Sequence, residues 1–474
     1  MEMYAESIEK SKFKSFKYKK WGNFKSLFRS CRHMGTYIWF EFKRKINNPK
    51  TLFLIVLMLV LSFQRIGHYR LEGAKYSSYV SFESYGESIE NLGSILFQRY
   101  GEGSEKDRDS FKLFMDTGEQ VKIAAKEEDY REWTRLSAFA ALIYAKSAAY
   151  GEGEQEKESF KSEAIEIWNE VSNGIDYDDV DFKYGDKTAY KTSSDFHLSE
   201  ARYYHTLYKK GLDPIGRNHI NSITFLYRYF DDIIPIAIGF IVLILIFDNV
   251  NEEWSNGSLK LVLTQPLSRK EYLASKLIVG ILYSLFIVLI PALIVLIGFG
   301  IVNGFQNYNY PVLYLGEGFK TIEPLPNYLK RDVDEKGGND FQGISIYSNI
   351  PGSNSGLSNR LVLIPLYKFI LLSLLLLTFC IIFYVTLNLL ISSTTKNKII
   401  AFTISGLITL IGTVYSQKWI VGDKYNLSPF TMNNPVRILN GTYNATALTA
   451  SIVLLGSALI IFLCNNLYYQ KKDL

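Results

Sequence analysis

The sequence predicts an all-α polytopic membrane protein with six transmembrane helices. An N-terminal interfacial helix precedes them, a large helical extracellular domain separates spans 1 and 2, and a smaller extracellular insertion separates spans 3 and 4. Three observations support this fold class. Six apolar runs of roughly 20 residues, each long enough to cross a bilayer as a helix, interrupt a chain of 474 residues whose mean hydropathy is only +0.03. Basic residues concentrate near the N-terminus, and the longest polar segment shows helical periodicity.

The distribution of charge sets the expected orientation. Residues 1–50 contain 13 Lys and Arg against 4 Asp and Glu, whereas 67–232 contain 21 against 31. Basic flanks of spans stay in the cytoplasm, so we expect both termini inside and 67–232 outside. The net charge of +5 is then a topology signal, and the basic end is expected to meet the lipid bilayer and no nucleic acid. A composition rich in Lys, Asn, Ile and Tyr suggests an AT-rich bacterial genome, and with the six spans we expect a multi-pass protein of the bacterial plasma membrane.

The segment before the first span is expected to lie on the membrane surface. Residues 1–21 form a basic cytoplasmic tail, and 22–47 form an interfacial amphipathic helix that ends in a break before TM1 at 48–67. Aromatic side chains supply apolar bulk and basic side chains contact anionic headgroups in such a helix; here they include Trp39, Phe40, Arg44 and Lys45.

The extracellular domain at 68–231 is expected to be helical. Apolar residues recur there every three or four positions, as on one face of a helix; they include Trp133, Leu136, Ala140, Ile143, Ala164, Ile167 and Val171. The acidic clusters lack the glycine and the distal glutamate of a calcium loop, so we expect solvated surfaces and no metal. Asp231 and Asp232 precede TM2 and are either a cation or substrate site or a charge pair that favours a helix N-terminus.

The remaining segments follow from the apolar runs and the breaks between them. Lys368 would be costly at the bilayer centre, so we place it at the outer interface, with Leu361–Tyr367 continuing the helix outside. Asn434 can cap a short helix with Pro435 at its first position. The expected segments are TM2 at 232–249, a cytoplasmic coupling element at 250–276, TM3 at 277–302, an extracellular insertion of turns and short strands at 303–360, TM4 at 361–391, TM5 at 398–416, an extracellular short helix segment at 427–441, TM6 at 447–467 and a cytoplasmic tail at 468–474.

The coupling element contains residues that begin and end short helices, as expected of a stiff structure. Gly257 allows a sharp turn, and Ser258 can cap a short amphipathic helix over Leu259–Leu263. Pro266 ends that helix. Ser268 begins the S-x-x-E pattern of a capping box, from which a new helix runs into TM3. A capped element just inside a membrane can receive force from a soluble partner.

The chain carries no pattern typical of catalysis. It has no G-x-x-x-x-G-K-[ST] loop to hold nucleotide phosphates, and its five histidines are scattered. His197 and His205 lie eight residues apart and are expected to have surface or core roles. We therefore expect neither an enzyme nor a bound cofactor.

The pattern E-x-x-x-G-[ST]-L-x-L-x-x-x-x-P-x-[ST]-R-x-x-[YF]-x-x-x-K occurs between TM2 and TM3. The residues that match it are Glu253, Gly257, Ser258, Leu259, Leu261, Pro266, Ser268, Arg269, Tyr272 and Lys276. With the order of spans around it, this pattern resembles that of the ABC-2 type permease family, the membrane subunits of ABC exporters.

The resemblance implies a mechanism. Two permease subunits, alike or different, would pair, and each would dock a separate ATP-binding cassette ATPase that binds ATP and Mg²⁺. The substrate would be a peptide, antimicrobial, drug or lipid-like molecule. Leu259, Leu261 and Leu263 would enter a groove on the ATPase as an amphipathic helix does. Glu253 and Arg269 would pair with partner charges or with each other, or lie at the membrane interface.

Two other functions remain open from the sequence. One is an ABC-type sensor or regulator whose outer domain binds an extracellular ligand with little flux. The other is a membrane scaffold without an energy source.

Overall fold

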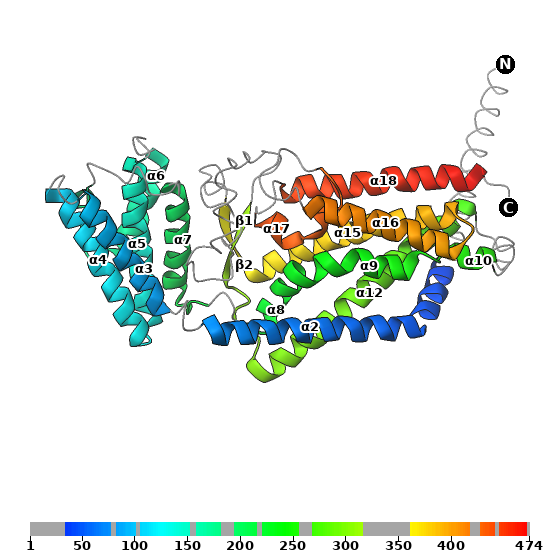
Figure 1. The fold of residues 1–474 in the computed structure, drawn as a ribbon, viewed down its shortest axis with the longest axis horizontal. Helices are drawn as coiled ribbons and strands as arrows, with labels where there is room; N and C mark the ends of the chain where they lie inside the picture. The colour runs from blue at the N-terminus through cyan, green and yellow to red at the C-terminus, as the bar shows by residue number, and fades with distance from the viewer. Residues whose placement is uncertain are drawn as a thin grey trace, which may run out of the picture.

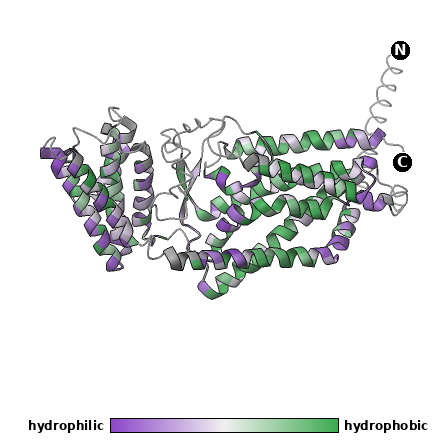
Figure 2. Ribbon diagram, in the orientation of Figure 1, coloured by the Kyte–Doolittle hydropathy of each residue, from purple (hydrophilic) through white to green (hydrophobic). Residues whose placement is uncertain are grey.

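The computed structural model describes residues 34–76, 82–100, 105–151, 158–181, 194–215, 220–255, 268–315, 361–417, 427–440 and 445–471. Its elements form two parts arranged end to end (Figure 1). One part is a bundle of long apolar helices, and the other is a group of more polar helices, α3 to α7 (Figure 2).

Five helical stretches in the described residues are long and apolar enough to cross a membrane, so the chain is a multi-pass membrane protein. Four are single helices, namely α2 (Pro49–Tyr76), α12 (Arg269–Asn303), α15 (Leu366–Thr394) and α18 (Ala447–Lys471). The fifth, Ser222–Trp254, joins α8 (Ser222–Arg228), the π-helical turn η2 (Tyr229–Ile233), α9 (Ile234–Ile246) and α10 (Asn251–Ser255). The predicted TM5 lies in α16 (Lys398–Gln417), whose apolar stretch, Lys398–Val414, is shorter than these five.

The α3–α7 domain is helical, as predicted. It consists of α3 (Phe82–Tyr100), α4 (Glu105–Lys126), α5 (Tyr130–Gly151), α6 (Glu158–Val171), a short turn η1 (Tyr177–Asp179) and α7 (Ser194–Lys210). The periodic apolar residues of α5 are buried, but so is almost every position from 133 to 149, because α5 packs against α4, α6 and α7. Helices α3 and α4 approach closely at Gly118, where a Cβ atom would lie 2.6 Å from the backbone nitrogen of Glu90.

A short antiparallel sheet lies between the two parts. Strand β1 (Pro311–Leu315) pairs with β2 (Leu361–Pro365), with Leu313 opposite Leu363. The prediction that Leu361–Tyr367 extends the TM4 helix was therefore wrong, and α15 begins at Leu366. The physical reason is that Pro365 disfavours a helix through the residues before it, while β1 supplies hydrogen bonds to the extended chain.

Tyr310, just before β1, joins the sheet to the α3–α7 domain. Its hydroxyl lies 2.7 Å from that of Tyr203 on α7 and accepts a hydrogen bond of 3.0 Å from the backbone nitrogen of Ile215. Its carbonyl accepts one of 2.8 Å from the nitrogen of Leu366, the first residue of α15. One buried residue thus contacts both parts of the molecule.

Asp231 and Asp232 do not begin a helix, so the charge-pair interpretation was wrong. A capping box formed by Asn221 and Thr224 begins the helical stretch. The two aspartates lie further along it, in η2. A π turn leaves carbonyls without their usual partners, and Pro235 has no N–H to give to the Asp231 carbonyl. The side chain of Asn434 donates to that carbonyl at 2.9 Å.

Asn434 also caps α17 (Pro435–Leu439), as predicted, by accepting a hydrogen bond from the backbone nitrogen of Arg437 at 3.1 Å. Val436, Ile438 and Leu439 of this helix are fully covered, because α17 packs against α15 and η2.

Candidate functional site

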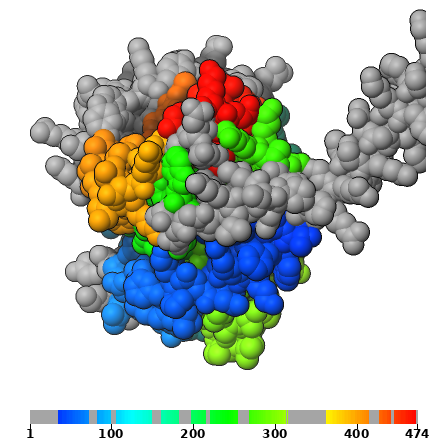
Figure 3. Space-filling view, turned by 90° about the vertical axis from the view of Figure 1, so that its right-hand side faces the viewer, coloured from blue at the N-terminus to red at the C-terminus, as the bar shows by residue number. Residues whose placement is uncertain are grey.

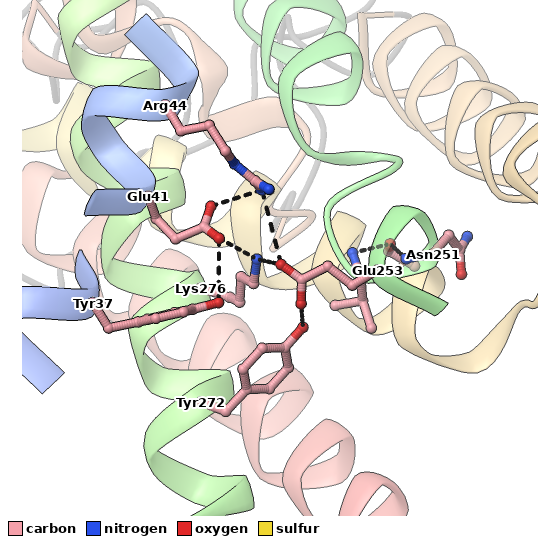
Figure 4. A network of polar contacts seen from close by, with 9 residues as sticks. Tyr37, Glu41, Arg44, Asn251, Glu253, Tyr272 and Lys276 are labelled. Carbon is pink, nitrogen blue, oxygen red and sulfur yellow. Dashed lines mark hydrogen bonds and ion pairs between the residues drawn. The ribbon is translucent and has the colours of Figure 1, made fainter. Parts of the chain in front are cut away.

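Three elements meet at the end of the bundle that is far from the α3–α7 domain (Figures 1 and 4). They are the helix at 34–46, which precedes α2, the short helix α10, and the first turns of α12. Residues three or four apart share one face of a helix, and this spacing brings six polar side chains together. We call them the charge cluster: Tyr37, Glu41, Arg44, Glu253, Tyr272 and Lys276.

Lys276 is the centre of the charge cluster. Its Nζ contacts the carboxylate of Glu253 and lies 3.3 Å from Oε1 of Glu41. Lys276 is fully buried, and Glu41 and Glu253 are 2% and 3% exposed. Leaving a buried charge without its partner is costly, so these three side chains fix the positions of their helices relative to one another.

The other members complete the hydrogen bonding of the carboxylates. The hydroxyl of Tyr272 donates to Glu253 at 2.6 Å, and that of Tyr37 donates to Glu41 at 3.3 Å. Arg44 lies 2.9 Å from Glu41 and 3.8 Å from Glu253, with 46% of its side chain exposed. Two carboxylates therefore face two cations.

The ionisation of Glu41 reflects this arrangement. Burial by itself opposes the charged form, but the cations of Lys276, Arg44 and Lys45 outweigh it and lower the pKa of Glu41 below its ordinary value. Glu41 is therefore a carboxylate at neutral pH, as the contact with Lys276 requires.

Further contacts attach α10 to the end of α15. The Oγ of Ser392 accepts a hydrogen bond of 3.1 Å from the backbone nitrogen of Val250, and a hydrogen bond of 3.2 Å joins the side chains of Asn251 and Thr395. The Nζ of Lys396 lies 5.8 Å from the ring centroid of Trp254. The helix that carries Glu253 is thus held on a second side.

Helix α12 is attached in the same region to the end of α18. Arg269 donates to the carbonyl of Gln470 at 3.1 Å, and the rings of Tyr272 and Tyr469 are stacked with centroids 5.9 Å apart. Figure 3 views this end of the molecule, with the blue N-terminal helices below the bundle and α18, in red, above it. The charge cluster therefore lies where four helical stretches and the 34–46 helix end close together.

The structure places three of the predicted coupling residues. Glu253 lies in the charge cluster, Arg269 contacts α18, and Ser268 forms the predicted capping box with Glu271, with hydrogen bonds of 3.2 and 2.7 Å. The other six predicted residues fall in 256–267 and lie outside the described residues: Gly257, Ser258, Leu259, Leu261, Leu263 and Pro266. The charge cluster lies beside both ends of that segment.

Sequence reasoning did not single out Glu41. It predicted a headgroup contact for Arg44, which the structure places beside Glu41 and Glu253. A signal for Glu41 was present, because it is the single acidic residue in the basic segment 22–47 and lies four residues after Tyr37. Its partner Lys276 is 235 positions away, so no local pattern joins the two.

Comparison with known protein families identifies the family of this chain. The family model described as "ABC-2 family transporter protein" matches residues 36–464. The chain belongs to that family. No curated protein and no solved structure matches the chain. The ABC-2 assignment makes this chain a permease subunit of an ABC transporter, a membrane transport component of a kind that is generally not catalytic itself and generally works with an ATP-binding cassette ATPase.

Proposed function

We propose that this permease exports its substrate with energy from ATP hydrolysis by a separate ATPase subunit that docks on the coupling element at 250–276. The charge cluster is the observation that supports this function most directly. It joins the segment before the first span, the end of the second and the start of the third. The residues on either side of the segment 256–267 are Ser255, the last residue of α10, and Ser268, the cap of α12.

The physical argument concerns stiffness. A displacement of 256–267 acts on Ser255 and Ser268, the residues at its two ends. Glu253 and Lys276 lie within eight residues of those ends and are locked together in a buried pair. Separating them would leave charges buried and unpaired, which costs several kcal/mol, on the order of 3–5. The cluster therefore transmits a push to the helices instead of absorbing it.

The rest of the proposal follows the charge distribution and the family. The cluster and both termini face the cytoplasm of a bacterial cell, and the α3–α7 domain faces outward. Two permease subunits, alike or different, form the complex with the ATPase, which holds ATP and Mg²⁺. The substrate is a peptide, antimicrobial, drug or lipid-like molecule.

The docking test uses the full-length chain expressed with the ATP-binding cassette ATPase that is proposed as its partner. Leu261→Asp places a charge on the predicted anchoring face and is expected to abolish co-purification of the ATPase and coupled transport. Thr264→Asp adds the same charge in the same element at a position that is already polar, and is the matched control. A complex and a transport rate unchanged by Leu261→Asp would contradict the proposal.

A further inference from the structure

A second polar region lies at the opposite end of the first span, in a pocket of about 300 Å³ between α2 and the η2–α9 stretch. One wall is formed by Leu61, Gln64, Arg65 and His68, which share a face of α2 because they are spaced three or four apart. The other wall is formed by Asp232, Ile233, Ile236 and Ala237. The pocket is open on one side, and Ile236 is 60% exposed.

The two walls have the same polarity gradient. Along α2 the lining changes from Leu61 to Gln64, Arg65 and His68 toward the end where the α3–α7 domain lies. The opposite helix runs the other way, and its lining changes from Asp232 to Ile236 and Ala237 away from that end. The polar residues therefore face one another at one end of the pocket, and the apolar residues face one another at the other end.

Ion pairs show the depth of the polar end. Lys50 contacts Asp248 at 2.7 Å near one end of α2, and Arg65 lies 4.0 Å from Asp232 near the other. Fifteen residues of helix rise about 22 Å, and the hydrocarbon core of a bilayer is about 30 Å thick. With Lys50 at one interface, the backbone of Arg65 lies about 8 Å short of the opposite edge of that core and that of His68 about 3 Å short, so both side chains can reach the headgroups.

The polar end has hydrogen-bond donors that other described residues do not use. The carboxylate of Asp232 accepts a hydrogen bond from Tyr69, and Arg65 is only at the limit of ion-pair distance from it. Within the described part of the chain, neither Gln64 nor His68 makes a hydrogen bond or ion pair. Arginine recognises phosphate through several parallel donors. The pocket offers one full positive charge and one full negative charge, which matches a headgroup that carries both.

We propose that this pocket binds a zwitterionic phospholipid. The phosphate lies against Arg65 and His68, the headgroup amine faces Asp232, and an acyl chain lies against Leu61, Ile233 and Ile236. With the orientation given under Proposed function, this lipid belongs to the outer leaflet, and that assignment rests on the proposed function. The binding itself does not, and it requires no ATPase.

The test measures lipid binding to the purified full-length protein in detergent by native mass spectrometry, with dioctanoyl phosphatidylethanolamine as the probe. The double variant Arg65→Gln/His68→Gln is expected to bind about tenfold more weakly, the loss expected for one charged hydrogen-bonding group. Arg70→Gln is the matched control. Arg70 is on the same helix with the same charge, but its guanidinium lies over the ring of Phe299 at 5.5 Å, outside the pocket.

Two further measurements separate the lipid from its parts. Ile236→Trp fills the apolar end without a change of charge and is also expected to weaken binding, whereas glycerophosphoethanolamine, the headgroup without chains, is expected not to bind. The proposal is overturned if the double variant binds the lipid as tightly as Arg70→Gln does. It is equally overturned if dioctanoylglycerol, which has no phosphate, binds as well as the phospholipid. Thermal unfolding of each variant shows whether a loss of binding reflects loss of the fold.

Discussion

Replacing Lys276 with methionine tests the charge cluster most directly. Methionine nearly fills the space of the lysine stem but leaves the carboxylates of Glu41 and Glu253 buried without their central cation. Removing one partner of a buried ion pair destabilises proteins by about 3–5 kcal/mol. Arg44 remains 2.9 Å from Glu41 and is partly solvated, so we expect a loss near the lower limit, about 3 kcal/mol.

The assay is denaturant unfolding of the full-length protein in detergent micelles, followed by tryptophan fluorescence. Lys270→Met is the control, because Lys270 is exposed in the first turn of the same helix, and we expect it to change stability by less than about 0.5 kcal/mol. The triple variant Lys276→Met/Glu41→Gln/Glu253→Gln removes the buried charges together. It should recover most of the lost stability, since neutral replacement of a buried ionic group is often tolerated.

The triple variant separates the stability of the fold from the transmission of force between the ATPase and the helices. The triple variant is expected to remain folded and bind the ATPase, yet to lose coupled transport, because neutral side chains no longer hold α10 and α12 together under load. If Lys276→Met and Lys270→Met unfold at the same denaturant concentration, the cluster does not hold these helices and the reasoning fails.

Three further predictions concern separate parts of the molecule. The pKa of Glu41 is lowered in the fold, so ionised Glu41 contributes stability above its unfolded pKa of about 4.3, and this contribution is lost as the pH falls through the lower folded value. The melting temperature of Glu41→Gln should therefore fall less steeply in acid than that of the wild-type protein. Asn434→Ala removes a helix cap and the donor to the buried Asp231 carbonyl, so we expect about 2–4 kcal/mol of destabilisation in denaturant unfolding, and near-wild-type stability would show that water replaces the amide. Gly118→Ala places a Cβ 2.6 Å from backbone and should cost about 1–3 kcal/mol, seen as faster hydrogen exchange in α3 and α4, whereas Gly67→Ala, with open space around it, should show no such change.

What could be predicted from the sequence was encoded locally. The Ser268 capping box and the Asn434–Pro435 helix start were found because the residues that make them are adjacent in the chain. The long apolar helices were found because lipid requires a continuous apolar run, and the predicted TM3 differs from α12 chiefly in that α12 also includes the helical turns before the membrane.

What could not be predicted depended on partners far along the chain. Leu361–Pro365 is apolar enough for either a helix or a strand, and pairing with β1 decides between them. Asp231 has its place because Asn434 reaches its carbonyl from 203 residues away. Glu41 resembled an incidental acid in a basic segment until Lys276 was placed beside it.

Tyr310 has a consequence for how the α3–α7 domain moves. Its hydroxyl is bonded to Tyr203 of that domain and to the backbone of Ile215, which follows α7, while its carbonyl is bonded to the first residue of α15. A tilt of the domain about that oxygen atom would keep the bond to Tyr203. Such a tilt would act through Tyr310 on the start of α15, whose other end carries Ser392, beside α10.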